Sequence, residues 1–176
     1  MAGVGAFICQ RNFALTSEPS YQLADFLGAE LGRHYAEEQR QVFFIAIGRF
    51  ENFDLISKDR KTSIEIKCEA LPLRTGKVCI EYWNPRLNKP SGILQTTATL
   101  WVHCIPENGT LTCYEYDVTA LRKLVIEMGE VKATTGAVFK LVPFSEFKQH
   151  AKHRFKLETQ FYEQLIGSHA EASSAG

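Results

Sequence analysis

Apolar and polar residues alternate most clearly in one stretch of the chain, FDLISKDRKTSIEIK, which runs from Phe53 to Lys67. Successive side chains of an extended strand point to opposite faces, so Glu65 and Lys67 share one face and Ile64 and Ile66 share the other. The polar run SKDRK interrupts the pattern and predicts a turn between two strands. One face of the second strand is therefore expected in the core, and the other carries charge.

The predicted hairpin also brings charged groups together. Folding at the turn places Asp54 beside Glu65, so two carboxylates and the Lys67 ammonium come within reach of one point. Hard divalent cations take oxygen ligands, and a neighbouring lysine can orient a water molecule for attack. This pattern predicts a divalent-metal site. An ordinary amphipathic strand with a surface ion pair is the alternative.

A helix is predicted before the hairpin, from about Ser20 to Glu37. Its apolar positions recur every three to four residues, after a polar segment with capping residues and a proline. Glu30 falls on or beside the apolar stripe, where an unpaired carboxylate is costly. We expect it either to find a partner at the metal site or to reach water from the edge of the stripe.

Further periodic segments predict the rest of the fold. The run QVFFIAIG at 41–48 predicts a central strand buried on both faces. Further elements are expected as strands at 77–83 and 99–105, a hairpin over 99–116, a helix opening at Asp117 and stopping at Gly129, an extended hairpin over 130–142, and a last helix from Pro143 to about Ile166. Together these elements predict an α/β (α+β) class, with a mixed central sheet flanked by helices.

Basic residues gather in the loops between these elements. Arg74 with Lys77 and Arg86 with Lys89 are candidate contacts for a phosphate backbone, and a further basic run covers 150–156. The net charge of zero argues against a protein that coats nucleic acid without specificity. The alternative is that each cluster is only a solvated face. Glu69 and Glu81 add carboxylates near the hairpin, and Glu81 either extends the metal site or pairs with a lysine.

Composition bounds the remaining possibilities. A chain of 176 residues, 45% hydrophobic, suits one domain over residues 1–167, with a disordered tail over 168–176. Without a signal-peptide pattern or a long apolar run, we expect a soluble, intracellular and cytoplasmic protein with no membrane partner. The five cysteines and the histidines show no zinc spacing. Walker and dinucleotide-binding loops are absent, so no organic cofactor is expected.

The hairpin resembles the PD-(D/E)XK nuclease superfamily, in which an acid ends one strand and (D/E)-x-K lies on the next. Asp54 matches the first acid and Glu65-Ile66-Lys67 the tripeptide, while Phe53 replaces the usual proline. The resemblance covers about residues 20–128 and implies a restriction endonuclease-like three-layer core. It also implies Mg²⁺ or Mn²⁺ held by Asp54, Glu65 and the Ile66 carbonyl, with Lys67 acting on the attacking water and Glu30 as a further acid.

A second segment resembles some phage-type members of that superfamily, which as a whole also contains restriction, repair, recombination and junction-resolving enzymes. The stretch SGILQTTA at 91–98 is similar to their S-G-I-x-x-T-x-A segment, a short helix beside the active site. Candidate contacts to a phosphate backbone are Ser91, Gln95, Thr96 and Thr97. The alternative for this stretch is a helix cap and turn.

The expected function is therefore a metal-dependent endonuclease that cleaves DNA with structural or weak sequence selectivity, as a homodimer. The rival hypothesis keeps the fold without the chemistry, as a nucleic-acid-binding or assembly module. Bases of a bound single strand would stack on exposed aromatic residues of this module, although aromatic residues are more often part of a core. The candidates are Tyr82, Trp83, Trp101, Tyr114 and Tyr116.

Overall fold

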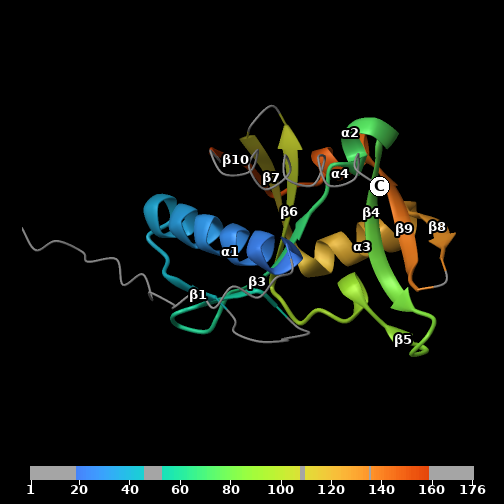
Figure 1. The fold of residues 1–176 in the computed structure, drawn as a ribbon, viewed down its shortest axis with the longest axis horizontal. Coiled ribbons are helices and arrows are strands. Elements are labelled where there is room, and N and C mark those ends of the chain that lie inside the picture. Colours follow the sequence, from blue (N-terminus) through green and yellow to red (C-terminus); the bar gives the residue numbers. More distant parts are fainter. Residues whose placement is uncertain (1–18, 46–52, 108–109, 135, 159–176) are drawn as a thin grey trace, which may run out of the picture.

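The computed structural model describes residues 19–45, 53–107, 110–134 and 136–158. Its described helices are α1 (Pro19–Glu38), α2 (Leu71–Thr75), α3 (Val118–Met128) and α4 (Phe144–Gln149), with a 3-10 turn η1 (Gly92–Leu94). Figure 1 shows α1 on one side of the strands of the larger sheet, and α3 and α4 on the other side of that sheet. The fold is mixed α/β, so the class predicted from the sequence is confirmed.

Six strands form the larger sheet. They are, in spatial order, β1 (Phe43–Ile45), β2 (Leu55–Ser57), β3 (Ser63–Cys68), β6 (Leu100–Glu107), β7 (Thr110–Asp117) and β10 (His153–Glu158). Neighbours pair antiparallel except β3 and β6, which run parallel with Lys67 opposite His103. The sheet is therefore mixed, and β3 lies near its centre.

A second, antiparallel sheet has four strands. Its spatial order is β5 (Lys89–Pro90), β4 (Lys77–Asn84), β9 (Val138–Pro143) and β8 (Glu130–Ala133). Strands β4 and β5 belong to the long connection that joins β3 to its parallel neighbour β6. A parallel pair needs such a crossover, and here the crossover forms half of another sheet.

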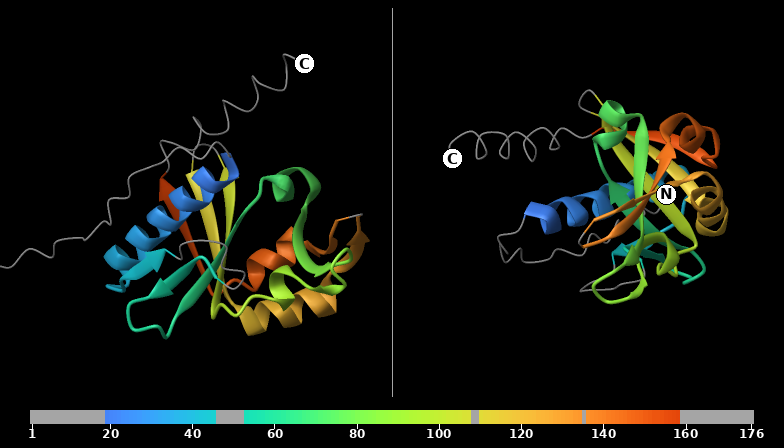
Figure 2. Two further views of the ribbon diagram at one scale, coloured as in Figure 1. Left: turned by 60° about the horizontal axis from the view of Figure 1, so that its bottom comes forward. Right: turned by 90° about the vertical axis from the view of Figure 1, so that its right-hand side faces the viewer.

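The larger sheet is covered on both faces (Figure 2). On one face, Leu31 and Tyr35 of α1 pack with Ile64 and Ile66 in one buried cluster. On the other, Trp101 and side chains of α3, α4 and β4 form a second cluster. Because Glu65 alternates with Ile64 and Ile66, its side chain lies on the face opposite α1.

Most predicted elements are confirmed. The helix from about Ser20 to Glu37, the hairpin over 54–67 with its turn at 57–61, the helix ending before Gly129 and the strand pair over 130–142 all have described counterparts. The predicted tail over 168–176 and the first 18 residues lie outside the described residues. Among the described helices, none is long and apolar enough to cross a bilayer.

Two predictions are wrong. The run 41–48 was expected as a central strand, but β1 lies at the sheet edge and leaves Phe44 and Ile45 exposed. The segment after Pro143 was expected as one helix to about Ile166, but α4 ends at Gln149 and β10 follows. Residues 46–48 and 159–166 of these two predictions lie outside the described residues. Residues 153–158 pair with residues 110–115 of β7, which satisfies backbone groups of β7 that would stay open if β7 were the edge strand.

Candidate active site

The hairpin of β2 and β3 places Asp54 next to the Glu65–Lys67 strand. The register pairs Leu55 with Ile64, and Asp54 occupies the bend just before β2. Its amide donates to the Ile64 carbonyl at 2.8 Å, and its Oδ2 accepts the Ile66 amide at 2.6 Å. The carboxylate of Asp54 is thus held against the backbone that follows Glu65.

Glu65 and Lys67 form an ion pair on the same face of β3. Lys67 Nζ lies 2.5 Å from Glu65 Oε1, and the Thr96 hydroxyl reaches Glu65 Oε2 at 3.4 Å. The Glu65 side chain is 12% exposed, whereas that of Lys67 is 45% exposed. The carboxylate is therefore largely desolvated, while the ammonium stays accessible from solvent.

The surroundings of Glu65 disfavour its ionised form. Burial raises the pKa of Glu65, and the negative charge of Asp54 raises it further, while the Lys67 ammonium opposes both. Ionised Asp54 and ionised Glu65 therefore repel one another. A cation placed between them would relieve that repulsion.

A cleft of about 290 Å³ opens in front of this pair. Its lining comes from β3 and β6 of the larger sheet and from β4 and β9 of the smaller one. The walls carry the carboxylates of Glu65, Glu69 and Glu81, together with Lys67 and His103. Acidic and basic groups thus meet where the two sheets adjoin.

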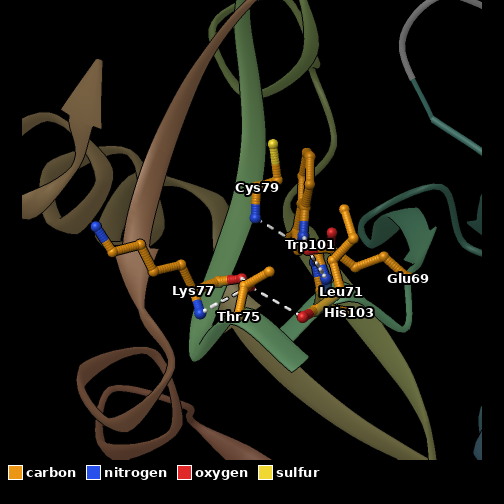
Figure 3. Close-up of polar contacts among 7 residues, drawn as sticks. All are labelled: Glu69, Leu71, Thr75, Lys77, Cys79, Trp101 and His103. Atoms are coloured by element: carbon orange, nitrogen blue, oxygen red, sulfur yellow. Dashed lines mark hydrogen bonds and ion pairs between the residues drawn. The ribbon is translucent and has the colours of Figure 1, made fainter. Parts of the chain in front are cut away.

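Glu69 and His103 form a second polar group in the cleft (Figure 3). His103 Nε2 lies 3.0 Å from Glu69 Oε1, which also accepts the Cys79 amide at 3.0 Å. On the other side of the ring, Trp101 Nε1 donates to His103 Nδ1 at 3.4 Å. An indole nitrogen can only donate, so Nδ1 is the acceptor and Nε2 carries the proton that bonds Glu69.

The structure thus adds Glu69 and His103 to the group predicted from the hairpin. Glu69 follows β3 in the same alternation as Glu65 and Lys67, so a sequence signal existed for it. His103 had none, because only the parallel register of β3 and β6 places it beside Lys67.

The stretch 91–98 contains η1 and packs beside the cleft. Arg122 of α3 holds it by donating to the carbonyls of Ile93 and Thr96, at 2.7 and 2.5 Å. Ser91 and Thr96 are buried, so neither hydroxyl is presented on the surface. Gln95 is half-buried and Thr97 is exposed, which leaves these two as the accessible candidates of the stretch.

The predicted basic contacts lie outside the cleft. Arg74 is exposed in the last turn of α2, and Lys77 pairs with Glu130 at 2.5 Å. Arg86 is exposed in the loop between β4 and β5, and Lys89 lies half-buried on β5. Of these four, Arg86 and Arg74 present the most accessible charges.

Glu30 lies apart from the predicted group. It belongs to α1, which covers the face of the sheet opposite Glu65, and it pairs with Arg33 at 2.8 Å. Its side chain is 24% exposed, which matches the edge of an apolar stripe. The partner that a carboxylate needs there is therefore an arginine one turn along the same helix.

Most of the proposed stacking aromatics belong to the core. Trp101, Tyr114 and Tyr116 are buried, whereas Tyr82 and Trp83 are half-buried. A buried ring cannot offer its face to a base, so the first three are excluded as stacking surfaces in this conformation.

Among the described residues, no group of three or more His, Cys, Asp or Glu side chains is placed to hold a metal ion. The hairpin supplies two carboxylates, a smaller set. Comparison of the chain with models of known protein families, with characterised proteins and with solved structures returns no match.

Proposed function

We propose that this protein is a divalent-metal-dependent endonuclease of PD-(D/E)XK type that hydrolyses DNA phosphodiester bonds. The observation that carries the proposal is the grouping of three charged residues in the hairpin. Asp54 lies in the bend before β2, and Glu65 and Lys67 lie on β3. The acid that precedes the hairpin is bonded to the amide inside the Glu65-Ile66-Lys67 tripeptide. Glu65 and Lys67 then share the face that opens on the cleft.

The donor set fits a magnesium or manganese ion. Mg²⁺ is commonly held by one or two carboxylates, with waters and phosphate oxygens completing its shell. Asp54 and Glu65 would hold it, with the Ile66 carbonyl as a third protein ligand, and the bound charge would offset the repulsion that Asp54 exerts on ionised Glu65. Bound there, the ion would supply Lewis-acid stabilisation of charge on the phosphate.

Lys67 contributes the positive charge that comes from the chain itself. In the described structure its ammonium bonds Glu65 Oε1. A cation held by Glu65 would weaken that bond, and the half-exposed ammonium could then turn toward a phosphate oxygen or the attacking water. Lys67 would then orient the water and offset the charge that develops on the scissile phosphate.

The arrangement of elements supports the finer fold assignment within this proposal. Helix α1 precedes three successive antiparallel strands, β1 to β3, and β6 then joins β3 in parallel. This order is consistent with a restriction endonuclease-like core. The four-stranded sheet inserted between β3 and β6, and completed after α3, adds a second wall to the site.

The test is cleavage of plasmid, linear, single-stranded and branched DNA, each with Mn²⁺ and with EDTA. We expect cleavage with the metal and none with the chelator. Lys67→Ala should abolish most cleavage while it leaves metal and DNA binding intact, and Asp54→Asn should weaken metal binding.

A catalytically inactive binding module predicts a different outcome. Its DNA binding would be indifferent to the chelator, and no combination of DNA and metal would yield product. Loss of DNA binding in Lys67→Ala and Asp54→Asn alike would indicate a folding defect or this binding role.

A further inference from the structure

We propose that Glu69 takes the proton from the attacking water and that His103 positions Glu69 for this step. The inference rests on the proposed nuclease function and adds the proton acceptor that Asp54, Glu65 and Lys67 leave unassigned. It is carried by the juxtaposition of Lys67, Glu69 and His103 in one cleft.

Glu69 lies on the correct face of the strand. The ladder between β3 and β6 continues past Cys68, because the Glu69 amide donates to the Cys104 carbonyl at 3.1 Å. Glu69 therefore keeps the alternation of β3 and shares the face of Lys67, two residues away, or about 7 Å along the strand. A water between the two side chains can accept from Lys67 and donate to Glu69.

The carboxylate is oriented by two donors on one oxygen. Oε1 accepts both the Cys79 amide and the His103 ring, each at 3.0 Å. With both of these donors on Oε1, we assign Oε2 as the oxygen that meets the attacking water. A carboxylate held in this way loses little freedom when a water binds to it.

The division of roles follows from exposure. His103 is 2% exposed and both of its ring nitrogens are engaged, so it has no free nitrogen for a proton from water. Glu69 is 16% exposed and lines the cleft, so it is the member of the pair that water reaches. His103 is thus a positioning residue, itself held by Trp101 and by the edge of the Phe147 ring.

The step balances without a further reactant. As the water oxygen forms its bond to phosphorus, one of its protons passes to Glu69 Oε2, and the ester bond to the leaving sugar oxygen breaks. The leaving oxygen takes a proton from solvent, and Glu69 later returns its proton to solvent. The products are a phosphomonoester and an alcohol.

The test compares a carboxylate of the cleft with one outside it. Glu69→Gln should lower kcat about 100-fold or more, the range of general-base catalysis, with DNA binding unchanged. Glu127→Gln is the control, since Glu127 lies exposed on α3 outside the cleft, and it should keep kcat within about threefold of wild type. Added formate should restore cleavage at least tenfold in Glu69→Ala and leave the wild-type rate unchanged.

Two variants examine His103 separately. His103→Phe keeps an aromatic ring but loses the donor, and it should lower kcat about tenfold with KM unchanged. His103→Gln retains an N–H for Glu69 and should recover much of the loss. Thermal unfolding of each variant shows whether the buried substitution has disturbed the fold.

The outcomes separate this role from the proposed function. If wild type cleaves DNA while Glu69→Gln cleaves equally fast, or formate has no effect on Glu69→Ala, the role of Glu69 is wrong and the nuclease assignment stands. If wild type cleaves no DNA with either metal, the proposed function is overturned, and the role of Glu69 with it.

Discussion

At the scale of single residues, the most informative group is Glu65. Its carboxylate is largely desolvated, is repelled by the negative charge of Asp54 and pairs with the Lys67 ammonium. Burial and Asp54 both raise its pKa, so ionising it opposes folding when no cation is bound. A site that is costly without its ligand is a common feature of functional carboxylates.

Glu65→Gln should therefore stabilise the protein at neutral pH. The pKa of Glu65 is higher in the folded protein than in the unfolded chain. Its protonated form therefore stabilises the fold below the ordinary glutamate pKa, and this stabilisation is lost as the pH rises through the pKa of the folded protein. The variant should gain on the order of 1 kcal/mol in unfolding free energy over wild type at pH 7.5, and little at pH 4. Urea unfolding of both proteins in the presence of EDTA, at pH 7.5 and at pH 4, measures these two differences in unfolding free energy.

Bound metal should make wild type more stable to unfolding than Glu65→Gln, the reverse of the order without metal. Mg²⁺ at 100 times its Kd should stabilise wild type by about 2.7 kcal/mol and should stabilise Glu65→Gln far less. Glu127→Gln, at an exposed position on α3, is the control and should behave as wild type. Equal stabilisation of all three proteins would place the metal elsewhere.

At the scale of elements, α1 and η1 each make close contacts that particular substitutions can test. Helix α1 is joined to the sheet by a buried hydrogen bond from Tyr35 to Glu115 and by the His34 ring stacked on Phe155 at 4.0 Å. The turn η1 lies directly on β4, since a Cβ added to Gly92 would fall 2.2 Å from the Glu81 carbonyl oxygen.

The α1 contact predicts an order among two tyrosine variants. Tyr35→Phe removes a buried bond to a carboxylate and should cost about 2–3 kcal/mol of unfolding free energy, because Glu115 stays buried without that donor. Tyr116→Phe removes a bond to the Phe147 carbonyl and should cost about 1 kcal/mol. Chemical denaturation of both proteins gives the comparison, and the reverse order would contradict the importance of the α1 contact.

Two glycines with positive φ give a matched pair for η1. Gly92 has φ +49°, and a Cβ added there would clash with backbone atoms of Glu81. Gly76 has φ +67°, and a Cβ added there would have no atom within 4 Å. Gly76→Ala should cost about 1–2 kcal/mol from backbone strain alone, and Gly92→Ala about 3–4 kcal/mol, since a steric clash adds to the strain. Thermal unfolding distinguishes them. Equal costs would show that η1 moves freely away from β4.

At the scale of the whole molecule, Arg154 adds a second positive charge to the face of the larger sheet that carries Lys67. Across the larger sheet, Lys67 is followed by His103, Tyr114 and Arg154 on neighbouring strands. Three strand spacings place Arg154 about 14 Å from Lys67, and its guanidinium lies over the Tyr114 ring. With a net charge of zero, plain duplex DNA should bind modestly and lose affinity steeply with salt.

Reversal of charge in the β4–β5 segment tests the phosphate contacts. Arg86→Glu with Lys89→Glu should weaken DNA binding and reduce the slope of log K against log salt by about 2, with metal affinity unchanged. Lys123→Glu, at an exposed position on α3, is the control. A filter-binding salt titration measures the slope, and an unchanged slope would remove this segment from the DNA surface.

A homodimer would double these contacts and place one active site on each strand of a duplex. Light scattering at micromolar concentration should give twice the mass of the chain. A monomer at every concentration would contradict this expectation.

The sequence by itself determined the elements whose periodicity is local. Strand β3 with its charged and apolar faces, the hairpin before it, and helices α1 and α3 all follow from patterns a few residues long. The ion pair of Glu65 with Lys67 follows from the same alternation, because side chains two residues apart on a strand share a face.

Only the tertiary structure decided which elements became neighbours. An apolar run does not reveal whether its strand has one neighbour or two, so β1 was expected at the centre and lies at the edge. Likewise, β10 is held by pairing with β7, about 40 residues earlier in the chain. The local sequence pattern of this segment favoured a helix, so the strand was not predicted. His103 entered the site, and Glu30 stayed outside it, because register and layer order depend on contacts between residues far apart in sequence.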